Sequence, residues 1–289
     1  MAEWRPQGIN GQPEGTQAMT TTDVFARGLF KGKTVFITGG GSGINLGIAK
    51  TFAALGANIG MCGRTQEKLD SAKKELEALG AKVCGVAADV RNYAALEASL
   101  QESEIQLGPA SVLVCGAAGN FPCPAEALSP NGFKSVIDID LLGSFNTCRA
   151  AFPQLQKTRG SVIFISAGQA FLPYAMQCHV GAAKAGIDNL MRNLALEWGR
   201  HGIRCNSVAP GPIEGTEGFQ RLLPEGAREK MQEHIPLQRF GQVEDIGNVC
   251  AFLASPLASY LTGTLIVADG GQNLPGSGYF THLLMSQMG

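Results

Sequence analysis

The sequence predicts an α/β fold: a single Rossmann-type, doubly wound parallel sheet of about seven strands with helices on both faces. Three observations support this prediction. Short continuous apolar runs alternate with longer helical patterns, as in parallel sheets that are covered on both sides. The first apolar run ends in a glycine-rich turn that opens a helix. No linker or composition break follows residue 32, so we expect residues 31–289 to form one domain after a flexible extension over residues 1–30.

The elements are predicted in chain order from their periodicity. A strand at 35–37 is followed by the glycine turn and by a helix whose apolar residues recur at Ile44, Ile48 and Phe52. The amphipathic helix at 67–79 ends at Gly80, and the helix at 180–198 carries small residues that permit close packing. The same patterns predict strands at 57–62, 81–88, 110–115, 160–166, 203–209 and 265–268, and helices at 92–107, 131–155 and 245–253. Right-handed crossovers between these elements give the doubly wound sheet.

The composition excludes several classes of protein. Apolar residues make up 45% of the chain and charged residues 16%, so a large core can be buried. The net charge of −1 gives no reason to expect nucleic acid as a partner, and no apolar run is long enough for membrane insertion. The eight cysteines and four histidines are dispersed, so we expect reduced thiols and no metal site. Residues 1–30 lack the basic start and apolar middle of a secretory signal.

The stretch from Thr38 to Gly47 predicts a dinucleotide site. A strand that turns on glycines into a helix directs backbone N–H groups and the positive end of the helix dipole at one point, which binds a phosphate. We assign this contact to Gly39, Gly41, Ser42, Gly43 and Ile44. A plain glycine turn is the less favoured alternative, because the flanking strand and helix are present and a second strand follows at the right distance.

The end of the second strand indicates which nicotinamide cofactor binds. An acidic residue there would bind the ribose hydroxyls of NAD, but this strand ends in Cys62-Gly63-Arg64 without a carboxylate. Arg64 instead offers a bidentate, charge-assisted contact for a 2′-phosphate. We therefore expect NADP(H). The alternative is that Arg64 is a solvated residue at the start of a helix.

Ligands of such sheets bind beyond the carboxyl ends of the strands, so further site residues are expected there. The candidates for cofactor binding are Asp89, Val90, Ala117, Ala118, Gly119, Pro210, Gly211, Ile213 and Thr216, and those for substrate binding are Asn120, Phe121, Ser166 and Gln169. A buried lysine needs a partner, so Lys184 on a helix face of small residues is assigned to function. Asp140, on an otherwise apolar helix, is either functional or a structural capping residue.

These residues resemble the short-chain dehydrogenase/reductase family over nearly the whole chain. The resemblance rests on Thr38-Gly39-x-x-x-Gly43, Asp89-Val90, Ala117-Ala118-Gly119, Lys184, Asn206 to Pro212 and Ala268 to Gly271. Asn45 replaces the family's usual third glycine, where it either narrows the turn or adds an amide contact to the cofactor. The family's tyrosine, serine and asparagine positions are Val180, Ala167 and Asp140 here, and neither valine nor alanine can transfer a proton.

The altered set resembles the peroxisomal type of 2,4-dienoyl-CoA reductase and its bacterial relatives, in the segments 115–121, 138–140, 179–185, 211–218 and 253–263. The resemblance implies an NADPH-dependent oxidoreductase that reduces 2,4-dienoyl-CoA to 3-enoyl-CoA in the β-oxidation of unsaturated fatty acids. The mitochondrial branch has a tyrosine where this chain has Gln169, which argues against that branch. We expect Asp140 and Lys184 to be catalytic, with a water between them as the acid and with Lys184 also on the nicotinamide ribose.

Two alternatives remain open at this point. One is another short-chain reductase that acts on a ketone or enoyl substrate, with Tyr174 or water as the acid. The other is a catalytically inactive NADP(H)-binding protein, which the missing tyrosine and serine would favour.

The resemblance also implies an acyl-CoA substrate and a homotetramer. Arg221, Arg228 and Lys230 lie either on a basic rim for the CoA phosphates or on a solvated face. The sequence ends in Gln287-Met288-Gly289, without the peroxisomal tripeptide, so a cytoplasmic location is expected.

Overall fold

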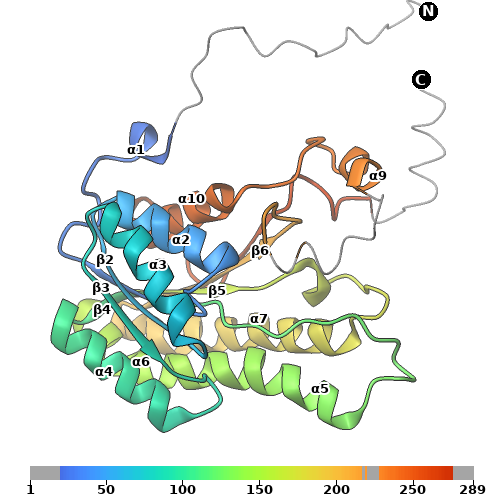
Figure 1. The fold of residues 1–289 in the computed structure, drawn as a ribbon, viewed down its shortest axis with the longest axis horizontal. Helices are drawn as coiled ribbons and strands as arrows, with labels where there is room; N and C mark the ends of the chain where they lie inside the picture. The colour runs from blue at the N-terminus through green and yellow to red at the C-terminus, as the bar shows by residue number, and fades with distance from the viewer. Residues whose placement is uncertain (1–19, 217–218, 220–227, 276–289) are drawn as a thin grey trace, which may run out of the picture.

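The computed structural model describes residues 20–216, 219 and 228–275. Within these residues, seven strands form one parallel sheet in the order β3-β2-β1-β4-β5-β6-β7 (Figure 1). The strands are β1 Thr34–Thr38, β2 Asn58–Gly63, β3 Val83–Ala87, β4 Ala110–Cys115, β5 Ser161–Ile165, β6 Arg204–Pro210 and β7 Leu265–Ala268. The strand order reverses at β1, so a ligand crevice is expected where β1 and β4 end side by side. The predicted fold class is confirmed.

Helices cover both faces of this sheet. One face carries α2 Gly43–Ala54, α3 Gln66–Ala78 and α10 Val243–Ala254, and the other carries α4 Tyr93–Leu107, α6 Gly143–Thr158 and α7 Cys178–Trp198 (Figure 1). Successive residues of β1 show the two layers, because Ile37 packs in the cluster that includes Phe52 of α2, whereas Phe36 packs in the cluster that includes Leu155 of α6. Both faces of the strands are therefore buried, which accounts for their continuous apolar sequences.

The long helix expected at 131–155 is interrupted. Helix α5, Pro130–Val136, passes into the π-helical turn η1, Ile137–Leu142, before α6 begins. The apolar periodicity continues through this turn, so the sequence pattern alone does not reveal it. A π-helical turn is rare and is found mostly at functional sites, and this one carries Asp140.

The domain begins slightly before the predicted boundary at residue 31. Phe30 is buried and its ring lies 4.9 Å from that of Phe52, centroid to centroid. The short helix α1, Thr21–Val24, is held to α10 by a hydrogen bond of 2.7 Å from the Thr21 hydroxyl to Asn248 Oδ1. Thr21 and Phe30 of the expected extension therefore contact the domain, and residues 1–19 lie outside the described residues.

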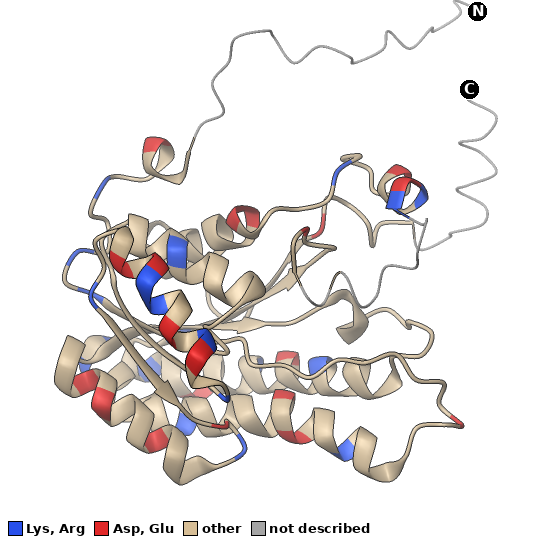
Figure 2. Ribbon diagram, viewed as in Figure 1, with Lys and Arg blue, Asp and Glu red and all other residues tan. Residues whose placement is uncertain are grey.

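Charged side chains lie mainly on the outer helices, with both signs interspersed (Figure 2). Arg204 of β6 is the one charged residue in the described strands. In the described part of the chain, no helix is both long and apolar enough to cross a membrane, and no cluster of three metal-ligating side chains is present. All eight cysteines are free thiols.

Candidate active site

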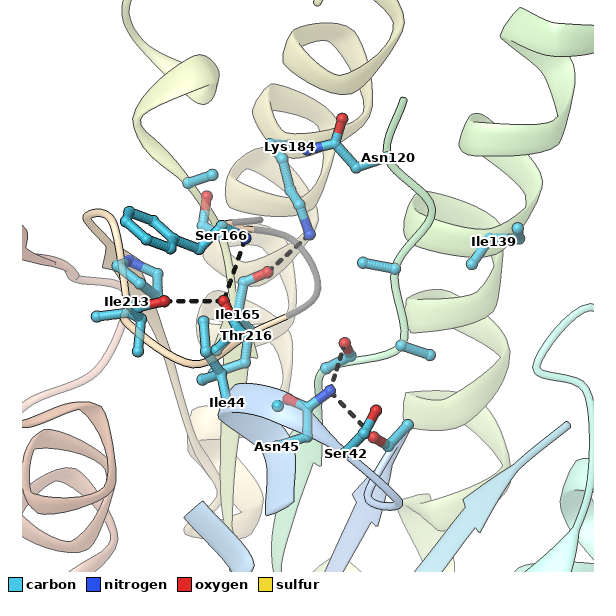
Figure 3. A pocket seen from close by; sticks show the side chains of 18 of the residues that line it. Ser42, Ile44, Asn45, Asn120, Ile139, Ile165, Ser166, Lys184, Ile213 and Thr216 are labelled. Carbon is cyan, nitrogen blue, oxygen red and sulfur yellow. Dashed lines mark hydrogen bonds between the residues drawn. The ribbon is translucent and has the colours of Figure 1, made fainter. Parts of the chain in front are cut away.

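A cleft of about 770 Å³ opens at the carboxyl ends of the strands, at the expected reversal point. Most of the residues predicted for the site line it: Gly39, Gly41, Ser42, Gly43, Ile44, Arg64, Asp89, Val90, Ala117, Ala118, Asn120, Ser166, Gln169, Lys184, Pro210, Gly211, Ile213 and Thr216. Figure 3 shows several of them converging from the glycine turn, the β4 and β5 ends and α7. Gly119, Phe121 and Asp140 do not line the cleft: Gly119 donates its N–H to the buried Asp140 next to the wall, and Phe121 is partly exposed against His179.

The glycine turn has the backbone that a phosphate site requires. Gly39 and Gly43 adopt left-handed φ angles of 71° and 57°, which side chains other than glycine rarely accept. The N–H groups of Gly39 and Gly40 donate to Cys62 O at 2.8 and 3.3 Å, which fixes the turn against β2. Ser42 stands at the N-cap position of α2 without a side-chain capping hydrogen bond, and the first residues of the helix, Gly43 and Ile44, line the cleft, so the N-terminus of α2 suits an anion.

Asn45 occupies a place between this turn and the end of β4. Its side-chain nitrogen donates to Gly116 O at 2.8 Å and more weakly to Gly39 O at 3.3 Å (Figure 3). The amide therefore joins two backbone segments instead of narrowing the turn. Its oxygen is buried and has no hydrogen-bond partner among the described residues.

Asp140 and Lys184 form a buried ion pair at the cleft wall, with Lys184 lining the cleft and Asp140 behind it. Asp140 Oδ2 lies 3.1 Å from Lys184 Nζ, and the two side chains are 0% and 8% exposed. Asp140 Oδ1 accepts from the Gly119 N–H at 2.7 Å, and Lys184 Nζ donates to Ile165 O at 2.9 Å. Asp140 Oδ2 is near the lysine but lacks an aligned hydrogen bond within the described residues, so it can accept one from a further group.

The π-helical turn places Asp140 toward the sheet. It is completely buried although its neighbour Asp138 pairs with the exposed Lys134. The Ser144 hydroxyl donates to Asp140 O at 2.5 Å, so this backbone carbonyl of the π-helical turn has a hydrogen-bond donor. The backbone of η1 thus aims the carboxylate at Lys184 of α7.

The positions that carry the family's tyrosine and serine are apolar. Val180 is 2% exposed and packs with Val136 and Ala183, and Ala167 presents only a methyl group to the cleft. The neighbouring Ser166 is buried, and its hydroxyl donates to Asp188 Oδ2 at 2.9 Å. Burial raises the pKa of Asp188, although the hydrogen bond from Ser166 opposes this.

At the far end of the cleft, Arg64 is exposed beyond β2 and lines the wall together with Lys68. Asp89, at the end of β3, is bound by Arg91, with Arg91 Nη2 at 2.6 Å from Asp89 Oδ2. The Arg91 hydrogen bond lowers the pKa of Asp89, so its charge is retained and paired.

The opposite end of the cleft is formed by the loop after β4 and the segment before α7. Asn120 lines the cleft with a buried oxygen that has no described partner, while Phe121 turns away and its ring lies 4.6 Å from that of His179. Tyr174, the alternative acid, lines the cleft and donates to Asn273 Oδ1 at 2.6 Å. Burial raises the pKa of Tyr174, so it is protonated.

Several lining residues were not predicted from the sequence. Gln177 and Asn273 are uncharged and lie in no motif. Behind the wall, Asp188 accepts a hydrogen bond from the lining residue Ser166 across 22 positions in the chain, and it was not predicted either. The hydroxyl of Thr216, predicted for the cofactor, donates instead to Ile213 O at 2.8 Å and accepts from Phe219 N–H. Arg228 pairs with Glu214 and Lys230 is exposed, whereas Arg221 lies outside the described residues.

The cleft suits a nicotinamide dinucleotide. The glycine turn leaves the start of α2 open to a pyrophosphate, and the orphaned oxygens of Asn45 and Asn120 offer buried acceptors along the wall. The volume and the position at the strand reversal agree with this class of ligand.

The fold and this cleft are those of the short-chain dehydrogenase/reductase family, and the chain belongs to it. The family profile described as "Enoyl-(Acyl carrier protein) reductase" matches residues 39–273. The solved structure of levodione reductase superposes with a TM-score of 0.81 at 31% identity, covering 85% of this chain and 99% of that one. The protein is therefore an oxidoreductase with a nicotinamide cofactor.

Two relatives are more specific. The peroxisomal 2,4-dienoyl-CoA reductase of Saccharomyces cerevisiae is 45% identical over 260 residues, 89% of this chain and 89% of that protein. The enzyme of the same name from Danio rerio is 41% identical over 278 residues, 94% of this chain and 92% of that protein. Both names specify (3E)-enoyl-CoA as the product.

The cytoplasmic location expected from the sequence is wrong, because these relatives are named as peroxisomal enzymes. That expectation rested on a missing terminal tripeptide, and the absence of one signal does not indicate a compartment.

Proposed function

We propose that this protein reduces 2,4-dienoyl-CoA to 3-enoyl-CoA with NADPH. The observation that carries the proposal is the buried Asp140–Lys184 pair at the cleft wall, because Val180 and Ala167, at the positions of the family's tyrosine and serine, supply no proton. Identity to the yeast and zebrafish dienoyl-CoA reductases extends over most of the chain, well beyond the common fold.

The reaction asks for few groups from the protein. Bound NADPH supplies a hydride, which forms a C–H bond at the far carbon of the diene. Negative charge then spreads to the thioester oxygen, where hydrogen-bond donors stabilise it by roughly 10²–10³ in rate per donor. Asn120 and Lys184 carry N–H donors on the cleft wall (Figure 3). A proton at the carbon next to the thioester completes the reaction and leaves one double bond between the third and fourth carbons.

That proton comes from a water held at the buried pair. Asp140 Oδ2 is 3.1 Å from Lys184 Nζ and still able to accept a hydrogen bond, so both groups can hold one water. The charge on the substrate is delocalised over the dienolate, so this intermediate does not have to be protonated as soon as the hydride is transferred, and a positioned water can serve as the acid. A positioned acid of this kind contributes about 10²–10⁴ in rate.

NADPH is favoured over NADH by the charges at the end of β2. The strand ends without a carboxylate, and Arg64 lies exposed on the cleft wall where the adenosine ribose of such cofactors binds. A guanidinium at this place can hold the 2′-phosphate with two hydrogen bonds. Asp89 interacts with Arg64 but is held mainly by Arg91, so it cancels this charge only in part.

A homotetramer is supported by two exposed apolar areas. Phe145 of α6 and Leu142 of η1 are each 43% exposed beside a groove that also includes Phe152 and Trp198. The second area is the edge strand β7, where Val267 is 43% exposed. Two different areas of this kind allow the two contacts that a tetramer with dihedral symmetry needs.

A substrate panel tests the function. NADPH oxidation is followed with 2,4-hexadienoyl-CoA, crotonyl-CoA and acetoacetyl-CoA, and turnover with the diene alone is expected. Asp140→Ala and Lys184→Ala should each lower that turnover by at least about 10²-fold. Near-normal turnover in both variants would contradict the assignment.

Tyr174 supports a second candidate, a reductase of ketones or single enoyl groups. It is protonated, half-buried and on the cleft wall, so it is the one tyrosine placed to act as an acid among the described residues. Turnover of acetoacetyl-CoA or crotonyl-CoA that is lost in Tyr174→Phe would favour this candidate.

A further inference from the structure

Asn45 joins two loops of the site, the glycine turn and the loop from Gly116 to Gly119, which lie beyond the ends of neighbouring strands. The glycine turn follows β1, and the loop from Gly116 to Gly119 follows β4. On one side the Thr38 hydroxyl accepts from the N–H groups of Gly116 and Ala117 at 3.1 and 3.2 Å. On the other side the Asn45 amide donates to Gly116 O and Gly39 O. The two ends of the strands are thus held from both sides.

The Asn45 side chain occupies the space that a side chain at position 116 would need. A Cβ atom on Gly116 would lie 2.0 Å from Asn45 Oδ1 and 2.6 Å from its Cγ, far inside van der Waals contact. The φ angle of Gly116 is not in the left-handed region, so its backbone accepts a side chain. The requirement for glycine at 116 therefore comes from Asn45 and not from the conformation of the chain.

The loop that Asn45 holds also holds the catalytic pair. Gly119 lies three residues beyond Gly116, and its N–H donates to Asp140 Oδ1 at 2.7 Å. Asp140 in turn pairs with Lys184. A short series of contacts thus leads from the phosphate turn, through residues 116–119, to the groups that deliver the proton.

From these contacts we propose that Asn45 is a positioning residue for hydride transfer, which fixes the cofactor turn relative to the Gly116–Gly119 loop and thereby to Asp140. The proposal rests on the proposed function for its substrate. It also explains the departure from the family's third glycine. Positions 45 and 116 share one space, so a side chain at one of them requires glycine at the other; we call this the reciprocity of the two positions.

The test compares Asn45→Leu, which keeps the branched shape without the hydrogen bonds, with Gly116→Ala and with the double variant Asn45→Gly/Gly116→Ala. Asn58→Leu is the matched control, because Asn58 also donates its amide to a main-chain carbonyl, that of Leu107, but lies at the start of β2, at the opposite end of the sheet. The measurements are the Kd of NADPH by fluorescence, kcat with 2,4-hexadienoyl-CoA at saturating NADPH, the kinetic isotope effect with NADPH deuterated at the transferred position, and the unfolding midpoint.

For Asn45→Leu we expect kcat to fall by about tenfold, which is the worth of one to two ordinary hydrogen bonds. The isotope effect rises because hydride transfer becomes slower, whereas Asn58→Leu changes neither quantity. Gly116→Ala weakens NADPH binding, and the second change, Asn45→Gly, restores much of that binding because it empties the occupied space. Unchanged kcat and isotope effect in Asn45→Leu, with only a lower unfolding midpoint, would overturn the proposal, as would absence of rescue in the double variant.

The failure of the proposed function is distinguishable from this result. If the wild-type protein binds NADPH but does not reduce the diene, the proposed function fails, while the NADPH Kd of the Gly116→Ala and double variants still tests the reciprocity of positions 45 and 116.

Discussion

Removal of one member of the Asp140–Lys184 pair is predicted to destabilise the fold more than removal of both. Two unit charges 3.1 Å apart attract by about 5 kcal/mol at an effective dielectric constant of about 20. The cost of burying both charges cancels much of this attraction in the intact pair. Asp140→Leu leaves the lysine buried without its counter-charge and should lower the free energy of unfolding by about 3–5 kcal/mol, as should Lys184→Met.

The double variant, Asp140→Leu/Lys184→Met, removes both charges. It leaves the Gly119 N–H without its acceptor, so it should remain about 1–3 kcal/mol less stable than wild type. Its diene reduction should nevertheless be lost, which separates stability from chemistry. Urea unfolding followed by circular dichroism, at one protein concentration, measures the first quantity, and NADPH oxidation measures the second.

The exposed pair of Lys134 and Asp138, one turn earlier, is the control. Its lysine is 69% exposed, so Lys134→Ala/Asp138→Ala should change stability by less than about 1 kcal/mol. If the losses in the two single variants at Asp140 and Lys184 simply add in the double variant, the two groups do not stabilise each other and the reasoning is refuted. Retention of diene turnover by the double variant would refute their role in catalysis.

Three further predictions concern the cofactor, pH and the alternative acid. Arg64→Ser should raise the Kd of NADPH by about 10–100-fold and change that of NADH little, as measured by fluorescence titration; equal losses for both cofactors would exclude a 2′-phosphate contact. Burial raises the pKa of Asp188 above its ordinary value of 3.8. Between pH 3.8 and the raised pKa, the folded chain still holds the carboxyl proton that the unfolded chain has lost, so the free energy of unfolding of the wild type falls as pH rises through this range. Asp188→Asn should therefore gain stability relative to wild type as pH rises above 3.8, and urea titrations that show a constant difference would contradict this. Tyr174→Phe should keep diene turnover within about twofold if water is the acid, whereas a loss near 10²-fold would identify the tyrosine as the acid.

The sequence was sufficient for the fold because its strands are continuous apolar runs that end in recognisable turns. Strands β4 and β7 were predicted with their observed bounds, and the other five shift by one or two residues at their ends, where hydrogen bonding rather than hydrophobicity decides the boundary. The π-helical turn at Ile137–Leu142 escaped prediction because it leaves the apolar pattern intact.

The site was predictable where a motif or a costly burial marked it. Lys184 among small residues required a partner, and Asp140 is that partner in the structure. Contacts of uncharged side chains with residues distant in the sequence are not indicated by any motif or buried charge. The Asn45 amide reaches Gly116 across 71 positions, and Tyr174 reaches Asn273 across 99. Only the folded arrangement brings these groups together.

The most direct measurement is the product of 2,4-hexadienoyl-CoA reduction by NADPH in D₂O, analysed by NMR. We predict one double bond between the third and fourth carbons, one solvent deuterium on the carbon next to the thioester, and the cofactor's hydrogen on the fifth carbon. In Asp140→Ala the rate should fall by at least about 10²-fold while the cofactor still binds. A double bond between the second and third carbons, or solvent deuterium placed on the fifth carbon, would contradict the account.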